Sequence, residues 1–136
     1  MSNARKSGAA ASSYRQGYLQ SLAWKARRAR WFREVMTRGR VLCAVCARVS
    51  TRPAREFELH HLSYRGVQAR PGGAWFADEP DEDLMPMHPL CHASVHRLID
   101  RDRVLSTQRT REVATREAIA RVRSLVRRKL GAGGLG

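Results

Sequence analysis

Residues 84–96 read LMPMHPLCHASVH, and this stretch decides the fold. The first four residues form a short apolar run that predicts a β-strand, although the proline within it weakens that prediction. Pro89 stands where the first turn of a helix tolerates a residue without an N–H, so we expect a helix from Pro89 to about Asp100. The stretch therefore predicts a strand that leads directly into a helix rich in potential metal ligands.

Two histidines of this helix are spaced to share one ion. His92 and His96 are four residues apart, which places their imidazoles on one face of a helix, one turn from each other. Upstream, residues 56–64 (EFELHHLSY) partly alternate in polarity and predict a strand that carries His60 and His61. One of this pair can complete a metal site while its neighbour stays available for proton transfer, because the unperturbed pKa of histidine lies near working pH.

A site built from imidazoles suits several metals. Such ligands are borderline-soft, so Zn²⁺, Ni²⁺, Co²⁺ or Mn²⁺ fits at least as well as Mg²⁺, which prefers oxygen. Two other interpretations stay open. Each histidine taken alone is more typical of a satisfied core or surface group, and His92 with His96 is also compatible with a purely structural second zinc.

The three cysteines predict a separate, structural zinc site. Cys43 and Cys46 have the two-residue separation with which a tight turn points both sulfurs at one ion. Three positions before Cys91 stands His88, which completes a set of three cysteines and one histidine and explains the odd cysteine count. The alternative is a redox pair with an unrelated buried Cys91, but the βαβ pattern typical of a thioredoxin-like motif is absent.

Taken together, these motifs resemble the HNH, or ββα-metal, endonuclease family, in its branch that contains a zinc knuckle. The resemblance covers approximately residues 18–100, including the helix-like segment YLQSLAWKARRARWFREV before the first cysteine. It implies a metal-dependent endonuclease that hydrolyses DNA phosphodiester bonds and leaves 5′-phosphate and 3′-hydroxyl ends. The implied residues are His61 as general base, His60, His92 and His96 as ligands of a catalytic divalent metal (Mg²⁺, Mn²⁺, Ni²⁺, Co²⁺ or Zn²⁺), and Cys43, Cys46, His88 and Cys91 as ligands of structural Zn²⁺. His96 matches the additional ligand of members such as the colicin DNases.

The chain departs from the family pattern at Asp83, where the family often has asparagine. That asparagine is thought to brace the loop that joins the two strands, and a carboxylate in its place can accept backbone N–H bonds but cannot donate. The implied fold class is α+β, a small ββα-metal core with a zinc knuckle between basic helices. We expect a disordered tail at 1–13, a basic helix at 14–40, the nuclease core at 41–100, a basic helix at 101–130 with Ser106 as its N-cap, and a flexible tail at 131–136.

Charge indicates a polyanionic partner. The 136 residues include 26 Lys plus Arg against 12 Asp plus Glu, a net charge of +14, and 23 of the bases are arginine. Arginine holds phosphate bidentately, so we expect DNA as the partner, although an arginine-rich surface can also be merely solvated. The expected phosphate contacts are Arg27, Arg28, Arg65 and Arg97. The loop at 65–83 (RGVQARPGGAWFADEPDED) carries an acidic cluster, Asp78, Glu79, Asp81 and Glu82, which we interpret as a solvated loop without regular structure.

No apolar stretch suggests a membrane span or a secretory signal, so we expect an intracellular, cytoplasmic protein. The nuclease hypothesis has two alternatives. One is a non-catalytic, zinc-stabilised nucleic-acid-binding module, which explains the charge and the cysteines but leaves the His60-His61 pair without a role. The other is an inactive nuclease subunit of a larger phage or host-defence assembly. Cleavage specificity, biological role and oligomeric state are not encoded in these motifs.

Overall fold

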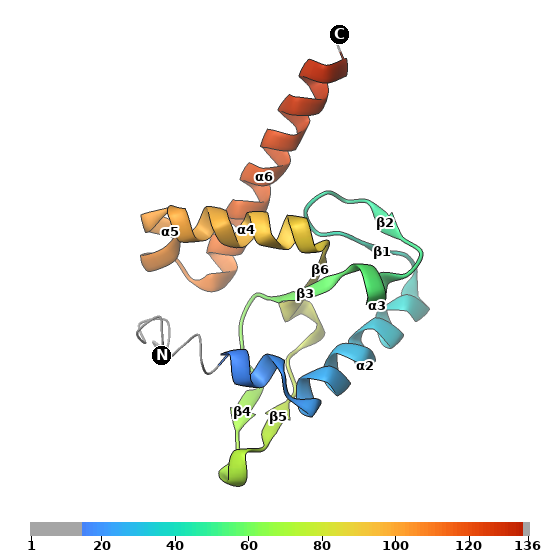
Figure 1. The fold of residues 1–136 in the computed structure, drawn as a ribbon, viewed down its shortest axis with the longest axis vertical. Coiled ribbons are helices and arrows are strands. Elements are labelled where there is room, and N and C mark those ends of the chain that lie inside the picture. Colours follow the sequence, from blue (N-terminus) through green and yellow to red (C-terminus); the bar gives the residue numbers. More distant parts are fainter. Residues whose placement is uncertain (1–14, 135–136) are drawn as a thin grey trace.

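The computed structural model describes residues 15–134, which form a mixed α+β fold of helices and small antiparallel sheets (Figure 1). The predicted disordered tail at 1–13 lies outside the described residues. Helix α2 (Leu22–Arg38) follows a helical turn at 15–19, and the break between them falls where the Ser21 side chain accepts a hydrogen bond from Trp24 N. The basic helix expected at 14–40 is thus interrupted, because Ser21 caps a new helix start. Helix α2 ends at Gly39, whose φ of 146° favours glycine.

The centre of the fold is the strand pair of β3 (Glu58–His61) and β6 (Leu84–Met87), followed by α4 (Pro89–Arg101). The pairing is antiparallel, with His61 opposite Leu84. This confirms the predicted strand at 84–87 and the helix start at Pro89. A second pair, β1 (Val41–Leu42) with β2 (Val49–Ser50), precedes the one-turn helix α3 (Pro53–Glu56).

The long loop predicted at 65–83 is wrong in part, because it contains a third antiparallel pair, β4 (Val67–Ala69) with β5 (Trp75–Ala77). Short 3₁₀ turns at Pro71–Gly73 and Asp81–Asp83 complete this segment. Gly66 makes the hairpin possible: its φ is +88°, and a Cβ there would lie 2.2 Å from Asp78 O. The segment is therefore folded closely on itself, and its glycines serve that geometry.

The C-terminal helix also differs from its prediction. Helix α5 (Arg103–Thr107) is capped by Asp102, and helix α6 (Arg111–Gly134) begins after a break at which Thr110 Oγ1 accepts from Val113 N. Ser106 is consequently not an N-cap, because Asp102 and Thr110 supply the caps on either side of it. The described part of the expected flexible tail, up to residue 134, continues the helix. Figure 1 shows α6 projecting beyond the rest of the fold, with α4 crossing its first turns.

The core joins α2, β1, β3, β6, α4 and α6. Its buried residues include Trp31 and Phe32 of α2, Phe57 before β3, Met87 of β6 and Val95 of α4. Within residues 15–134, no helix is long and apolar enough to cross a membrane.

Candidate functional site: a Cys3His cluster, a histidine cluster and a buried His–Glu pair

Three cysteines and one histidine converge where the β1–β2 turn meets the start of α4. The ligand atoms of Cys43, Cys46, His88 and Cys91 all lie within 4.8 Å of one another. Cys46 Sγ is 3.3 Å from His88 Nδ1, and the backbone N–H of His88 points at Cys43 Sγ, 3.5 Å away. This cluster could hold a metal ion such as zinc, as the cysteine spacing predicted.

The electrostatics of the thiols fit a cation at that place. Burial raises the pKa of Cys43, but backbone N–H groups of Cys46 and His88 outweigh burial and lower it to about 7. Burial and the neighbouring thiols raise the pKa of Cys91 to about 12. Three sulfurs this close cannot all be thiolates without a compensating positive charge, which a bound metal provides.

A second group, which we call the imidazole triad, consists of His60, His92 and His96. Its ligand nitrogens also lie within 4.8 Å of one another. His92 Nε2 is 3.1 Å from His60 Nδ1 and 3.0 Å from His96 Nε2. The structure thus brings together the three histidines predicted to share an ion, two from α4 and one from β3.

Each of two triad imidazoles has an outer partner that fixes its orientation. His92 Nδ1 lies 2.8 Å from Glu58 Oε1, and His60 Nε2 lies 2.8 Å from Thr115 Oγ1 of α6. Metal-binding histidines typically donate their second ring nitrogen to such a group, which selects the tautomer and directs the other nitrogen inward. Glu58 and Thr115 therefore favour lone pairs that converge on one point.

Two of the three triad imidazoles, those of His60 and His96, are kept neutral. Burial, with Arg111 as the next cause, lowers the pKa of His60 far below its usual range. Burial and the adjacent His92 lower the pKa of His96 to about 4. Neutral imidazoles are the form that coordinates metal, so the donor set fits a divalent cation.

His61 points to the opposite side of β3, into an aromatic pocket. Its ring stacks on Tyr64 with a centroid separation of 4.2 Å, and Trp24 lies 4.6 Å away. His61 Nε2 is 2.7 Å from Glu79 Oε2, the same oxygen that accepts a 2.6 Å bond from the Tyr18 hydroxyl. Burial lowers the pKa of His61, which keeps the ring neutral although Glu79 acts in the other direction.

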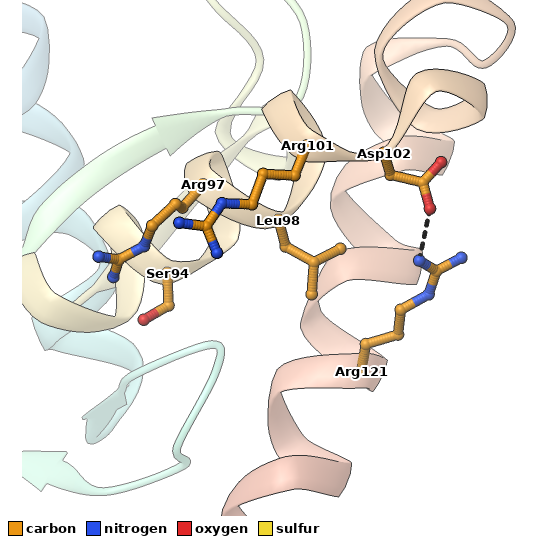
Figure 2. Close-up of a pocket in the computed structure, with 6 residues that line it drawn as sticks. All are labelled: Ser94, Arg97, Leu98, Arg101, Asp102 and Arg121. Carbon is orange, nitrogen blue, oxygen red and sulfur yellow. Dashed lines mark hydrogen bonds and ion pairs between the residues drawn. The ribbon is translucent and has the colours of Figure 1, made fainter.

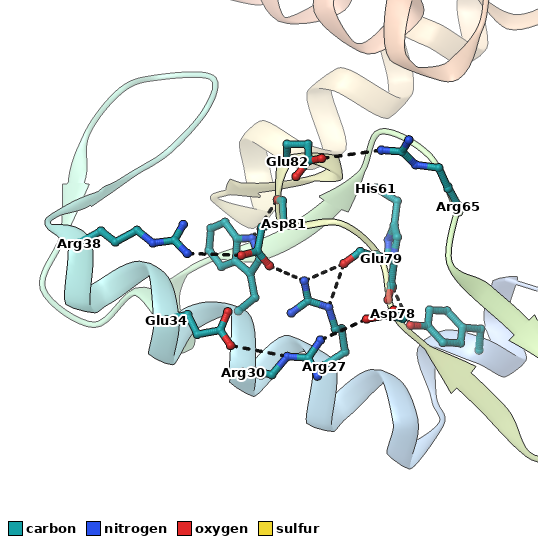
Figure 3. Close-up of polar contacts among 12 residues, drawn as sticks. Arg27, Arg30, Glu34, Arg38, His61, Arg65, Asp78, Glu79, Asp81 and Glu82 are labelled. Carbon is teal, nitrogen blue, oxygen red and sulfur yellow. Dashed lines mark hydrogen bonds and ion pairs between the residues drawn. The ribbon is translucent and has the colours of Figure 1, made fainter.

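Glu79 is the main correction to the interpretation of the acidic loop. It is 1% exposed rather than solvated, and hydrogen bonds from His61 and Tyr18 overcome burial and lower its pKa. Its backbone carbonyl accepts two bonds from Arg27, at 3.1 and 2.7 Å (Figure 3). The other loop carboxylates also face arginines: Asp81 pairs with Arg27 and Arg38, Asp78 with Arg30, and Glu82 with Arg65.

Of the predicted phosphate contacts, Arg27 is therefore wrong, and Arg28 is engaged by contacts within the protein. Arg27 is 3% exposed, and its guanidinium binds Glu79 O and Asp81, so phosphate cannot reach it. Arg28 donates to the carbonyls of Ala54 and Phe57 and lies over the Phe32 ring, so its charge is used to join α2 to α3. Both helix positions stabilise the fold.

Asp83 has a contact pattern that suits a loop brace. Its carboxylate accepts from Ser63 Oγ at 3.0 Å and from Arg65 Nε at 3.3 Å, and its carbonyl accepts from Leu62 N. It thus ties the start of β6 to the segment that leaves β3, through side-chain donors rather than the expected backbone N–H groups. Arg65 remains largely exposed, although it is paired with Asp83 and Glu82.

The remaining predicted arginine, Arg97, lines a groove of about 380 Å³ between α4 and α6 (Figure 2). Arg101 and Arg121 lie along the same groove, and Arg121 is paired with Asp102 at 2.7 Å. Ser94 adds a hydroxyl to the lining. This concentration of guanidinium groups suits an anion on the α4–α6 side of the molecule.

Four residues near the histidines were missed by sequence reasoning: Tyr18, Glu79, Arg111 and Thr115. Arg111 donates from Nε to His61 O at 2.6 Å and lies over the Tyr64 ring. These residues are distant in sequence from the histidines they contact. Tyr18, Arg111 and Thr115 lie on predicted helices, which was the one signal that the sequence offered for them.

Comparisons of this chain with protein-family models, with curated proteins and with solved structures found no match.

Proposed function

We propose that the chain is a metal-dependent DNA endonuclease of the HNH type, in which His61 is the general base. The observation that carries the proposal is the joint occurrence of the imidazole triad and the His61–Glu79 pair on adjacent residues of β3. The antiparallel β3–β6 pair followed by α4 is the arrangement that a ββα-metal core requires. A purely structural site would not need a second, oriented histidine beside it.

His60, His92 and His96 would hold the divalent metal. When bound, such a metal neutralises charge that develops on the phosphate and stabilises the leaving oxygen. The chain's own contribution is to bring three imidazoles together, with His92 oriented by Glu58 and His60 by Thr115. Three converging imidazole nitrogens fit a cation of borderline softness.

His61 would take the proton of the attacking water. Glu79 is positioned to accept a hydrogen bond from Nε2–H, which leaves Nδ1 with the lone pair. Nδ1 is the ring nitrogen that does not face Glu79. A neutral imidazole with one oriented N–H and one open nitrogen is the form a general base needs at neutral pH.

The basic groups available to DNA phosphates lie on the α4–α6 side. The arginines of α2 largely face the acidic loop, whereas Arg97 and Arg101 are exposed and α6 carries no acidic residue after Glu117. Arg111 is anchored through Nε to the His61 carbonyl and its charge acts on His60, so we expect its guanidinium to contact a phosphate at these sites. We expect these contacts to give salt-dependent binding with little sequence reading.

The test is His61→Ala, assayed by conversion of supercoiled plasmid to nicked and linear forms with Mg²⁺, Mn²⁺, Ni²⁺, Co²⁺ or Zn²⁺. We expect cleavage to fall by about 100-fold or more, because general-base catalysis contributes on the order of 10²–10⁴-fold. Zinc content and DNA affinity should persist in the variant. Unchanged cleavage in His61→Ala would refute the assignment, and absence of cleavage by the wild-type protein with every metal would refute the nuclease.

The deep burial of His61, 2% exposed, favours a second candidate, a zinc-stabilised nucleic-acid-binding module without catalysis. In that case the Cys3His cluster and the basic helices carry the whole function. The same assay separates the two, because the module predicts salt-dependent DNA binding in the absence of any strand cleavage.

A further inference from the structure

The Glu79 carboxylate is the acidic group that contacts the His61 ring. Oε2 lies 2.7 Å from His61 Nε2 and accepts the Tyr18 hydroxyl at 2.6 Å, and both Glu79 and Tyr18 are almost completely buried. The Arg27 guanidinium holds the backbone carbonyl of the same residue through two hydrogen bonds. Side chain and backbone of Glu79 are therefore fixed from three directions, by β3, by the turn before α2 and by α2 itself (Figure 3).

A carboxylate held in this way selects one tautomer of the imidazole. It accepts only, so the nitrogen that faces it must carry the proton, and the other nitrogen must then carry the lone pair. The Tyr18 hydroxyl strengthens this selection because it donates to the same oxygen and leaves the carboxylate as an acceptor for His61. The aromatic rings of Trp24 and Tyr64 hold the imidazole plane.

We propose that Glu79 is the positioning residue of His61, which holds the Nε2–H tautomer and so makes Nδ1 the basic atom, with Tyr18 orienting the carboxylate. This inference rests on the proposed function, since the general-base role gives the tautomer its purpose. No proton leaves the pair: in the base step Nδ1 gains the proton from water, Nε2 keeps its own, and the Glu79 carboxylate stabilises the resulting imidazolium.

The burial of the loop supports this role over a purely structural one. Asp78, one residue earlier, has the same charge but 66% of its side chain is exposed, and it reaches only Arg30 at 3.7 Å. A buried carboxylate that merely joined the loop to the fold would be costly compared with an apolar residue, because desolvation opposes its charge. The geometry directs that charge at one nitrogen of the histidine.

The experiment compares wild-type protein with Glu79→Ala, Glu79→Gln and the control Asp78→Asn. Nitrogen-15 histidine NMR of the zinc-loaded protein reads the tautomer of His61 directly, without DNA or cleavage. We expect a downfield, slowly exchanging Nε2–H proton in the wild type and in Asp78→Asn, and its loss in Glu79→Ala. Glu79→Gln keeps an acceptor oxygen of the same size and should retain part of the signal.

Cleavage kinetics supply the second measurement. We expect kcat to fall about 10- to 100-fold in Glu79→Ala, less in Glu79→Gln, with KM for DNA within about twofold in both. If Glu79→Ala does not fold, as judged by circular dichroism and zinc content, the isosteric Glu79→Gln carries the test. The inference would be overturned if the wild-type protein held the Nδ1–H tautomer of His61. It would also be overturned if folded Glu79 variants showed the same Nε2–H signal and the same kcat as the wild type.

The two readouts separate this inference from the proposed function. A glutamate-dependent Nε2–H signal in a protein that cuts no DNA would support the positioning and refute the nuclease. Cleavage that depends on His61 but not on Glu79 would support the nuclease and refute the positioning.

Discussion

Thr115→Val is expected to weaken metal binding by the imidazole triad although Thr115 is not a ligand. Thr115 is fully buried, and its hydroxyl is the partner of His60 Nε2 at 2.8 Å. Valine keeps the branched shape but cannot accept a hydrogen bond. The His60 N–H is then left buried without a partner, which costs about 1–3 kcal/mol, and loss of such an outer partner typically lowers metal affinity about 10- to 100-fold.

Cobalt binding and thermal unfolding test this prediction together. With zinc retained in the Cys3His cluster, Co²⁺ added to the triad is followed by its visible spectrum, which lacks the thiolate bands of a cysteine site. We expect a 10- to 100-fold rise in Kd, and a metal-free Tm that is lower by roughly 3–10 °C. The control is Thr107→Val, an exposed helical threonine of α5 that contacts only Arg103 O. If Thr115→Val binds Co²⁺ within twofold of wild type, the hydroxyl does not orient His60.

Three further predictions concern other parts of the fold. Cys46→Ser should abolish stoichiometric zinc and lower Tm, measured by metal analysis and calorimetry, whereas equal zinc content in the variant would exclude the cluster as its site. Gly66→Ala should destabilise the protein by about 2 kcal/mol or more in urea unfolding, because the new Cβ would meet Asp78 O. The control Gly72→Ala, with a similar φ of 85° but open space around it, should cost less. Equal losses of stability in the two variants would show that the contact with Asp78 O is not the cause. Arg97→Ala should weaken DNA binding and reduce the slope of log K against log salt concentration by about 0.9. Arg27→Met should lower stability and leave that slope unchanged, because Arg27 is buried. A change of the slope in Arg27→Met but not in Arg97→Ala would contradict the assignment of the binding face.

The ligand positions could be predicted because they depend on local periodicity. His92 and His96 share a face of α4 because they are one helical turn apart, and Cys43 with Cys46 lies on one tight turn. The start of α4 followed from proline, whose fixed φ and missing N–H suit only the first turn. None of these inferences needed to know how distant segments pack.

The partners of the histidines could not be predicted for the opposite reason. Glu79 reaches His61 across 18 residues and Thr115 reaches His60 across 55, so both contacts depend on tertiary packing. The glycine- and acid-rich composition around Glu79 is typical of a solvated loop, yet Gly66 and the β4–β5 hairpin fold it against α2. Composition indicated exposure where the backbone geometry imposes burial.

The roles of the arginines could not be predicted because they too depend on tertiary packing. Their number predicted a surface for polyanions, but Arg27 and Arg28 lie on the face of α2 that packs against the loop and α3. Hydrophobic periodicity does not identify a buried helix face that contains arginine. A buried guanidinium donates its hydrogen bonds to carbonyls and a carboxylate instead of to water, and the sequence does not show those partners.

The placement of His60 and His61 has a consequence for how the two sites are supported. Adjacent residues of a strand point to opposite faces, so His60 meets α4 and α6 while His61 meets α2 and the acidic loop. The metal-ligand set is therefore supported by α4, α6 and Glu58, and the base by α2 and the acidic loop, and the two sites meet at one peptide bond. Arg111 binds the His61 carbonyl from α6 and is the direct link between these parts. Changes at Thr115 and at Glu79 should consequently add independently in metal affinity and stability, whereas a change at Arg111 should couple to both, because Arg111 binds the backbone carbonyl of His61 and its charge also acts on His60.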